Sequence, residues 1–376
     1  MSISYKRKCF GHNSIYEDDY LIDNYKKRQF NLYYSSPEKG VNEHTGILLL
    51  IAGYGGHSNS NIFIKMRNQF ADKYNLVTIQ CDYFGYEFMQ SNLEGPLQIK
   101  NLDLNEIKNN ASPEDFNKIC INNTFNLQNY LNSHLKHETV ITVESFLNEN
   151  ISNFNDMGIM QALDNIVATK EVINELTSNN LKFNTNKVII MGNSHGSYLA
   201  YLCNSMCRGL YTHILDNSSW LYPTYYNNER TVSFHENNSI VNSIYNYNMI
   251  NIIPGIEPFN LKDLYRTFDN TCKIVVYHGE DDDLIPEAEK YEAVKDINNL
   301  IYKPIRKPDL DGLCFKSTSH GLNADYINLF DKYYTEYIND NICNNKVNIE
   351  EEIELYPDIF INYKSGFPEF ILNFEG

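Results

Sequence analysis

The sequence lacks a long hydrophobic run, an excess of basic residues and a paired cysteine motif. Its longest apolar stretch covers 47–52, far short of the roughly 20 residues that a membrane-spanning helix requires. No apolar segment follows the basic residues near the N-terminus, so no secretion signal is expected. Lys and Arg number 31 against 48 Asp and Glu, which gives a formal net charge of −17. This charge excludes the basic surface that grips nucleic acid or an anionic membrane.

The eight cysteines show no regular spacing and no Cys-x-x-Cys pair. Several lie in apolar, strand-like runs, as Cys81 and Cys272 do. Buried free thiols in a reducing cytosol explain this pattern. Cys203 and Cys207 are one helical turn apart, but no His or acid stands at a spacing that would complete a metal site. The sequence therefore predicts a soluble, cytoplasmic protein without a metal or other cofactor.

Neither an internal repeat nor a Pro/Gly/Ser-rich linker divides the 376 residues. Short apolar runs alternate instead with longer amphipathic segments, a pattern typical of a mostly parallel sheet covered by helices. Continuous apolar runs indicate strands that are buried on both faces. The sequence thus predicts a single α/β domain over 1–376 with a central, mostly parallel sheet flanked by helices. Strands are expected at 30–34, 46–51, 76–81, 187–191, 213–215 and 273–277.

Amphipathic segments between these strands predict the helices. In the segment 157–176 the apolar residues recur on one stripe, and Asp156 is placed to cap the first turn. Pro286 suits the first turn of a later helix, because its missing N–H would have no partner there. The other helices are expected at 61–70, 197–206, 286–297 and 323–338.

Two stretches, about 86–155 and about 217–265, break this alternation. The first is rich in asparagine and holds a helix start at Ser112, whereas the second is crowded with tyrosine and asparagine and has no clean period. Both follow strands, where insertions do not disturb a sheet. We expect them to form a cap over the carboxyl edge of the sheet, where open α/β sheets bind ligands. The tail at 340–376 is expected to be a strand-rich C-terminal appendage.

The strongest functional signal is the sequence Gly192-Asn193-Ser194-His195-Gly196, which joins an expected strand to an expected helix. A nucleophile on such a turn adopts a strained backbone conformation, typically with positive φ. The residues two before and two after it must be small, as Gly192 and Gly196 are. The turn lifts the Ser194 hydroxyl clear of the sheet, above the positive end of the next helix. Ser194 is therefore the predicted nucleophile.

A serine hydroxyl needs a base to take its proton. His320 lies in a loop, directly before Gly321 and the last long helix, which is the position and chain order that such a base requires. It is the predicted base. The remaining candidates precede the serine, point away from it, or belong to the cap or to a strand end: His44, His57, His195, His235 and His278.

An acid must orient that histidine. The segment 278–286 lies between the serine and the histidine and contains a run of four acids. It is anchored between a buried strand and the helix at Pro286, so at least one carboxylate is held in place. Asp216, at the end of the preceding strand, is the rival acid.

The turn Gly53-Tyr54-Gly55-Gly56 follows an early strand and opens a helix. Its glycines allow backbone N–H groups to approach a bound carbonyl closely. With the N–H of His195, the N–H of Tyr54 would form an oxyanion hole, which stabilises charge that develops in the transition state. A phosphate-binding turn is the alternative, but the GxGxxG pattern and the P-loop lysine are both missing.

These features together resemble the α/β-hydrolase superfamily, over roughly 28–85 and 155–340. The segment 278–286 is similar to the HGxxDxxxP acid loop of that superfamily. This similarity implies that Asp282 is the triad acid, in the chain order Ser194, Asp282, His320. The segment 156–196 also resembles an uncharacterised branch of the superfamily in bacteria with Asn- and Ile-rich proteomes, which implies no substrate.

The resemblance implies a serine hydrolase that cleaves a carboxylic (O-acyl) ester through an acyl-enzyme intermediate. Its substrate would be a small molecule or a glycan that carries an acyl group. An acyltransferase acting on a sugar or alcohol is the alternative, since a tyrosine-rich cap suits a polar, ring-shaped partner and could exclude water. A non-catalytic binding protein with this fold is a further alternative. It is disfavoured because nucleophile, base, acid and oxyanion turn are all present.

Overall fold

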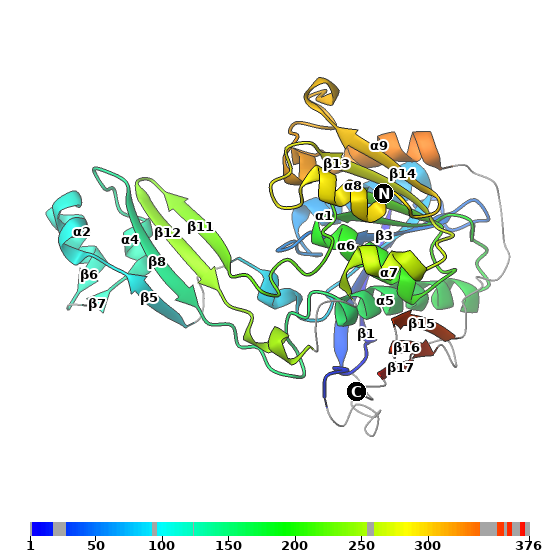
Figure 1. Ribbon diagram of the computed structural model, residues 1–376, viewed down its shortest axis with the longest axis horizontal. Helices are drawn as coiled ribbons and strands as arrows, with labels where there is room; N and C mark the ends of the chain where they lie inside the picture. Colours follow the sequence, from blue (N-terminus) through cyan, green and yellow to red (C-terminus); the bar gives the residue numbers. More distant parts are fainter. Residues whose placement is uncertain are drawn as a thin grey trace. The chain divides into compact units, whose positions relative to one another are not determined.

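The computed structural model falls into two compact units, both drawn in Figure 1. The first comprises 1–90, 151–224 and 251–376, and the second comprises 91–150 and 225–250. The structure describes residues 2–17, 28–91, 96–122, 124–253, 259–338, 352–356, 359–362 and 369–372.

An eight-stranded sheet with the order β1-β2-β4-β3-β9-β10-β13-β14 forms the centre of the first unit. From β4 to β14 all neighbouring strands are parallel, whereas β1 and β2 add to one edge in antiparallel fashion. The predicted fold class, a mostly parallel sheet flanked by helices, is confirmed. The strands are β1 (Ile3–Phe10), β2 (Gln29–Ser36), β3 (Gly46–Ile51), β4 (Leu76–Cys81), β9 (Val188–Asn193), β10 (His213–Asn217), β13 (Lys273–Gly279) and β14 (Leu300–Ile305).

Burial on both faces explains which strands were predictable. Every residue of β3 and β4 is buried; β3 is continuously apolar, and β4 is apolar or β-branched except at Gln80. The two outermost strands, β1 and β14, were not predicted. Most residues of β1 are exposed and those of β14 are mostly half-buried, so neither carries an unbroken apolar run.

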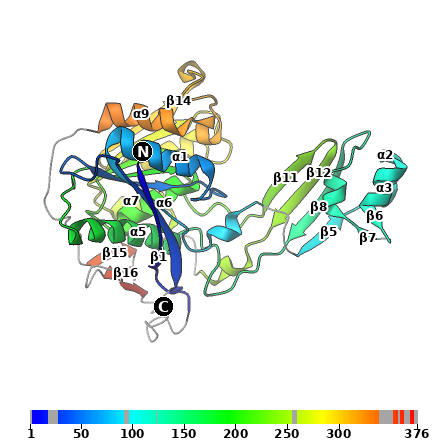
Figure 2. The same ribbon diagram turned by 180° about the vertical axis from the view of Figure 1, so that it is seen from behind.

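Helices cover both faces of this sheet. Helices α1 (Asn61–Tyr74) and α9 (Tyr326–Tyr337) lie on one face, and α5 (Ile159–Ser178) and α6 (His195–Met206) lie on the other (Figures 1 and 2). The rings of Phe70 and Phe330 stack between α1 and α9, with their centroids 4.6 Å apart. Two shorter helices, α7 (Leu261–Thr267) and α8 (Glu287–Val294), complete the described helices of this unit.

Two helix starts differ in detail from the expectation. Helix α8 begins at Glu287, so Pro286 is its N-cap residue and does not open its first turn. In α5 the N-cap residue is Gly158, yet the Asp156 carboxylate still accepts hydrogen bonds from the N–H groups of Gly158 and Met160, at 3.3 and 2.7 Å. The predicted role of Asp156 in satisfying the first turn is therefore confirmed.

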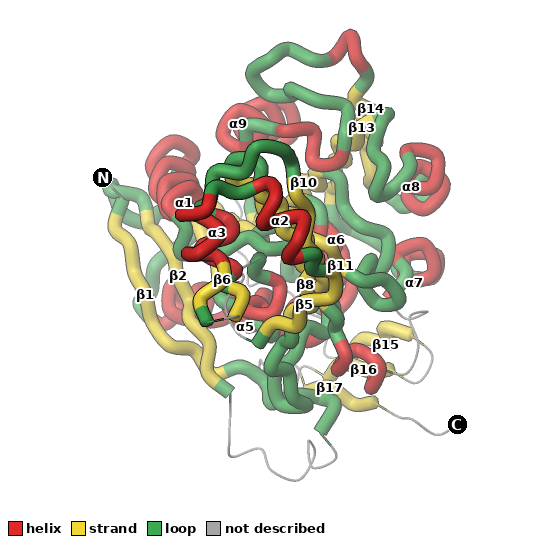
Figure 3. The backbone as a smooth tube through the Cα atoms, turned by 90° about the vertical axis from the view of Figure 1, so that its left-hand side faces the viewer, coloured by secondary structure: helices red, strands yellow, loops and turns green. Residues whose placement is uncertain are grey.

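The second unit has a four-stranded sheet with the order β11-β12-β8-β5. Helices α2 (Leu104–Asn110), α3 (Pro113–Ile119) and α4 (Leu127–Leu131) pack on it around a core that includes Ile107, Ile141 and Val241. Figure 3 shows these helices in red and the strands in yellow. The strands are β5 (Leu97–Asn101), β8 (Thr139–Ser145), β11 (Arg230–Glu236) and β12 (Ser239–Tyr245), beside the short pair β6 (Cys120–Ile121) and β7 (Thr124–Phe125).

The stretch 217–265, whose sequence shows no clean period, nevertheless contains regular structure. The strands β11 and β12 lie there and pair in antiparallel fashion around a turn at Asn237, whose φ is 52°. The alternation in β11 is hidden because its residues are exposed or half-buried and mostly polar. The cap role of this stretch and of 86–155 stays a prediction.

The tail contributes β15 (Glu352–Tyr356), β16 (Ile359–Asn362) and β17 (Glu369–Leu372), which form an antiparallel sheet. Cys343 lies outside the described residues, and Cys9, Cys81, Cys120, Cys203, Cys272 and Cys314 are free thiols. No helix in the described ranges is long and apolar enough to cross a membrane. Those ranges also hold no cluster of three or more His, Cys, Asp or Glu residues placed to bind a metal ion.

Candidate active site

Ser194 lies on the tight turn between β9 and α6. Its φ of 54° and ψ of −121° confirm the positive φ expected from the glycine pattern. A Cβ atom on Gly192 would lie 2.4 Å from the backbone of Ser197, and one on Gly196 would lie 2.3 Å from the carbonyl oxygen of Ile51. Only glycine fits at these two positions, so the close approach of strand and helix holds Ser194 in its strained conformation.

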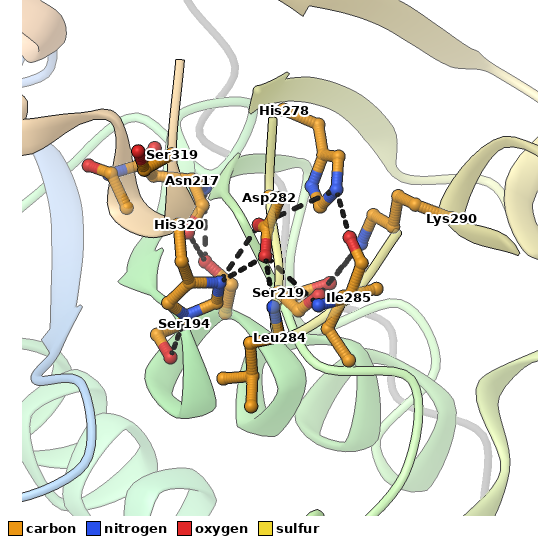
Figure 4. A network of polar contacts seen from close by, with 12 residues as sticks. Ser194, Asn217, Ser219, His278, Asp282, Leu284, Ile285, Lys290, Ser319 and His320 are labelled. Carbon is orange, nitrogen blue, oxygen red and sulfur yellow. Dashed lines mark hydrogen bonds and ion pairs between the residues drawn. The ribbon is translucent and has the colours of Figure 1, made fainter. Parts of the chain in front are cut away.

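The side chains of Ser194, His320 and Asp282 form a hydrogen-bonded series (Figure 4). Ser194 Oγ lies 2.7 Å from His320 Nε2. The other ring nitrogen, Nδ1, lies 2.8 Å from Oδ2 and 3.0 Å from Oδ1 of Asp282. The structure thus brings together the three residues expected from the sequence as nucleophile, base and acid.

Asp282 is held firmly and stays ionised. Its side chain is buried, and Oδ1 accepts hydrogen bonds from the backbone N–H groups of Leu284 and Ile285, at 3.1 and 2.9 Å. Burial alone would raise the pKa of Asp282, but the hydrogen bond and charge of His320 outweigh it and keep the pKa below its usual value. A carboxylate in this state can accept a hydrogen bond from the N–H of His320 Nδ1.

The rival acid, Asp216, is engaged elsewhere. Its Oδ2 accepts hydrogen bonds from Lys290 Nζ at 2.8 Å and from the Tyr201 hydroxyl at 2.9 Å, while Oδ1 accepts the N–H of Ser219 at 2.8 Å. Both Asp216 and Lys290 are fully buried. Burial lowers the pKa of Lys290, and the charge of Asp216 opposes that effect. Asp216 therefore belongs to an internal ion pair and makes no hydrogen bond to His320 in the part of the chain that the structure describes.

A second histidine, His278, lies behind Asp282. Its Nε2 donates to the carbonyl oxygen of Ile285 at 2.8 Å and lies 3.5 Å from Asp282 Oδ2. Burial, and then the nearby charge of Lys290, lower the pKa of His278, so its ring is neutral. It packs against the acid and does not reach the serine.

Asn217, the last residue of β10, was missed by the sequence analysis. Its Nδ2 donates to Asn193 Oδ1 at 2.7 Å and to the carbonyl oxygen of Gly321 at 3.2 Å. Its own carbonyl oxygen accepts the N–H of Ser194 at 2.8 Å. One buried amide thus links the residue before Ser194 to the residue after His320. The signal was a polar residue at the end of a predicted buried strand.

His320 stands at the start of an unusual turn. The next three residues, Gly321, Leu322 and Asn323, have φ values of 72°, 61° and 41°. Leu322 is fully buried in the core beneath α9, and its N–H donates to the carbonyl oxygen of Ser319 at 2.9 Å. Packing of the Leu322 side chain therefore holds a left-handed conformation that a branched residue would otherwise avoid.

The glycine turn expected to contribute to an oxyanion hole lies against the elbow. The N–H of Gly56 donates to the carbonyl oxygen of Gly53 at 2.8 Å, which closes the turn. A Cβ atom on Gly53 would lie only 2.9 Å from the carbonyl oxygen of Asn193. Tyr54 lines the same pocket as Ser194, and its hydroxyl accepts a hydrogen bond from Asn155 at 2.5 Å.

His195, the other expected donor, is the first residue of α6. Backbone N–H groups in the first turn of a helix have no carbonyl partner within that helix. The His195 ring is buried between the rings of Tyr54 and Trp220, with centroid distances of 5.5 and 4.8 Å. Burial lowers the pKa of His195 to about 3, so its ring is neutral.

A pocket of about 620 Å³ opens beside Ser194 and His320, within the first unit. Residues of the two site turns form one side, and α1 and the start of α9 form an apolar wall. The lining of the pocket also includes the charged side chains of Lys65, Lys316 and Asp325. Besides Ser194, His320, Gly53, Tyr54, Asn193 and Gly321, the lining includes Ile62, Lys65, Met66, Lys316, Asn323, Ala324, Asp325, Tyr326 and Ile327.

The sheet order and the strand–turn–helix at Ser194 define an α/β-hydrolase fold. Similar solved structures include Est1E from Butyrivibrio proteoclasticus with bound ferulic acid, at 13% identity and a TM-score of 0.42 over 82% of this chain and 94% of that one. A putative dienelactone hydrolase from Klebsiella pneumoniae matches at 10% identity and 0.43, over 89% and 98%. Thermogutta terrifontis esterase 2 matches at 12% identity and 0.43, over 88% and 94%. No curated protein matches the sequence.

The family model described as "Protein of unknown function (DUF2920)" matches residues 18–239, which is more than half of the chain. The chain belongs to this family. The matched range includes the glycine turn and Ser194 but ends before Asp282 and His320. Because the family's description carries no activity, a function has to be argued from the site.

Proposed function

We propose that this protein is a serine hydrolase that cleaves a carboxylic ester through an acyl-enzyme intermediate. The observation that carries the proposal is the series Asp282–His320–Ser194, with its 2.8 and 2.7 Å contacts, beside a pocket of about 620 Å³. Nucleophile, base and orienting acid in mutual hydrogen-bond reach are the arrangement that acyl transfer to serine requires.

In the first half of the reaction, Ser194 Oγ attacks the ester carbonyl carbon while His320 Nε2 takes the hydroxyl proton. Asp282 keeps the proton on Nδ1 and stabilises the imidazolium that forms. The N–H groups of Tyr54 and His195 would bind the oxyanion of the tetrahedral intermediate. The carbon–oxygen bond to the alcohol then breaks, His320 gives its proton to the leaving oxygen, and the acyl group stays on Ser194.

In the second half, water replaces the alcohol. His320 takes a proton from the water as its oxygen attacks the acyl carbon, and returns it to Ser194 Oγ when the serine leaves. One ester and one water become one acid and one alcohol, and the enzyme is regenerated. The cytoplasm is the proposed setting, in keeping with the free cysteines of the described chain.

Labelling with a fluorescent fluorophosphonate tests the proposal. The wild-type protein should be labelled, and Ser194→Ala should not, because only an activated serine reacts with the probe. A panel of esters of graded acyl length then measures turnover. Labelling without hydrolysis would favour acyl transfer to a sugar or alcohol, and absence of labelling would favour a binding role and overturn the proposal.

A further inference from the structure

Two lysines of the candidate pocket, Lys65 and Lys316, stand out in an acidic protein. Lys65 projects from α1, one turn after Ile62, and Lys316 lies four residues before His320. The chain carries a formal charge of −17, so a lysine has acids in excess to pair with. Neither side chain has an ion-pair partner among the described residues.

Other lysines near these elements behave differently. Lys73, also on α1, lies 2.8 Å from Asp331 of α9. Lys332, on α9, lies 3.1 Å from Glu336. The unpaired state of Lys65 is therefore not a property of α1 or of its neighbour. Lysines outside the pocket, Lys39 among them, also lack an ion-pair partner among the described residues, so what distinguishes Lys65 and Lys316 is that both line the pocket beside Ser194 and His320.

The pocket lining within the described ranges contains a single carboxylate, that of Asp325. Its Oδ1 accepts the N–H groups of Ile327 and Asn328, both at 3.1 Å, and so caps the first turn of α9. The partial positive charge of that helix end already meets the Asp325 charge. Within the described residues, neither Lys65 nor Lys316 has a carboxylate at ion-pair distance.

The rest of this wall is apolar. Ile62, Met66, Tyr326 and Ile327 line it, and the Ile62 side chain is 54% exposed. A ligand that fills the pocket would bury this surface and place a negative group near the two ammonium groups. Lysine binds carboxylate and phosphate as a point charge, without the fixed geometry that arginine imposes.

We propose that the substrate is an ester that carries an anionic group, a carboxylate or a phosphate, which Lys65 and Lys316 hold while the ester carbonyl meets Ser194. This inference rests on the proposed hydrolase function and names its substrate class. The lysines act on specificity and take no part in the bond changes.

Matched esters test the charge preference. 4-Acetoxybenzoate and 4-acetoxybenzamide have nearly the same shape and the same acetyl group, and differ in one negative charge. We expect the wild type to hydrolyse the anion with a kcat/KM about 10-fold higher or more, because each lysine contributes roughly 3- to 5-fold. Lys65→Gln and Lys316→Gln should each lower the ratio by that factor, and the double variant should abolish the preference.

The control is Lys39→Gln, which removes the same charge from an exposed turn outside the pocket and should leave both rates unchanged. Added salt should reduce the wild-type preference, since exposed charges are screened. 4-Acetoxyphenyl phosphate distinguishes the two anions: a larger preference for it than for 4-acetoxybenzoate assigns the site to phosphate, and the reverse assigns it to carboxylate. An equal or lower kcat/KM for both anions than for the amide overturns the inference.

Binding separates this inference from the hydrolase proposal. The Ser194→Ala variant is titrated with 4-acetoxybenzoate and with the amide by calorimetry. If the wild type hydrolyses neither ester, the hydrolase proposal fails, but tighter binding of the anion that disappears in the double lysine variant still supports the anion site. Equal affinity for the two esters, or no binding of either, overturns the anion site even where hydrolysis occurs.

Discussion

Asp216 lies near the end of β10 and Asp282 lies beyond the end of the neighbouring parallel strand β13; both carboxylates are buried, yet they have different partners. Asp216 is bound to Lys290 inside the protein, whereas Asp282 is bound to His320, whose other nitrogen reaches Ser194. Burial and position at the end of a strand therefore do not distinguish these two candidates for a triad acid. The side chain that each carboxylate contacts does, because only Asp282 is hydrogen-bonded to a histidine that reaches Ser194.

The difference arises from the path of the backbone. Asp216 is still within β10, and its neighbour Leu215 belongs to the core beneath α1 and α9. Because successive side chains of a strand point to opposite faces, Asp216 points toward the other face, where it meets Tyr201 of α6 and Lys290 of α8. Asp282 lies beyond the end of β13, so its side chain reaches the loop that carries His320.

The largest effect on turnover is expected for Ser194→Ala, which changes the serine that Asp282 reaches through His320. The change removes the nucleophile, so ester turnover should fall by about four orders of magnitude or more. The melting temperature should stay the same within about 2 °C, because one oxygen is lost at a partly accessible turn. Rates and thermal unfolding on the same preparation check this, and retained turnover would move the chemistry away from the elbow.

Asp282→Asn tests the acid directly. The amide keeps the shape but removes the charge and can donate to Nδ1, which favours the wrong tautomer of His320. Turnover should fall by roughly two to four orders of magnitude. Asp281→Asn and Asp283→Asn are the controls, and each should lose less than about one order. If Asp216→Asn loses turnover while Asp282→Asn stays active, the acid is Asp216 and the assignment of Asp282 is wrong.

Asp216→Asn should instead cost stability. It leaves the Lys290 ammonium buried without its counter-charge, so the free energy of unfolding should fall by about 3 kcal/mol, while turnover stays within about one order of magnitude. Urea denaturation measures the loss. The double variant Asp216→Leu with Lys290→Met removes both charges and should be less destabilised than Asp216→Asn; a larger loss would mean that the ion pair is net stabilising.

Asn217→Leu tests the link between the nucleophile's turn and the histidine's turn. Loss of both Nδ2 hydrogen bonds frees the His320 turn, so kcat should fall by about 10- to 100-fold with KM nearly unchanged. Asn217→Gln places an amide at the same site and should restore part of the loss. The rate of fluorophosphonate labelling should decrease from wild type to Asn217→Gln to Asn217→Leu. Equal rates for the two variants would contradict the positioning role of Asn217.

The smallest effect concerns a third buried carboxylate, Asp156. Burial raises the pKa of Asp156 from 3.8 to about 7 in the folded protein. Its folded pKa lies above its unfolded pKa, so the contribution of Asp156 to stability should fall as the pH rises from about 4 to about 7. The lowered pKa of Asp282 acts in the opposite direction, because its contribution is lost as the pH falls. Unfolding of Asp156→Asn and wild type at pH 5 and pH 8 should show a smaller pH difference in the variant.

The fold class and the central strands were predictable because buried parallel strands leave continuous apolar runs, as in β3 and β9. The turn at Ser194 was recognisable because its steric demand selects glycine at fixed positions. Asn217 and the Lys290–Asp216 pair were not predictable, since those contacts join residues far apart in the chain and no spacing rule describes them. The hairpin β11–β12 was not predicted, because a polar, exposed strand such as β11 leaves no hydrophobic period in the sequence.

The left-handed turn after His320 makes the geometry of the proposed catalytic site depend on the hydrophobic core. The backbone strain at Leu322 amounts to about 1–2 kcal/mol and persists only because its side chain is locked beneath α9. Any loosening of that packing relaxes the turn first, so on heating or in mild denaturant catalysis should disappear before the sheet unfolds. The rate of ester hydrolysis should then report on the packing of this side of the core. A substitution such as Leu322→Ala should lower the temperature at which activity is lost, although Leu322 does not contact the reacting atoms.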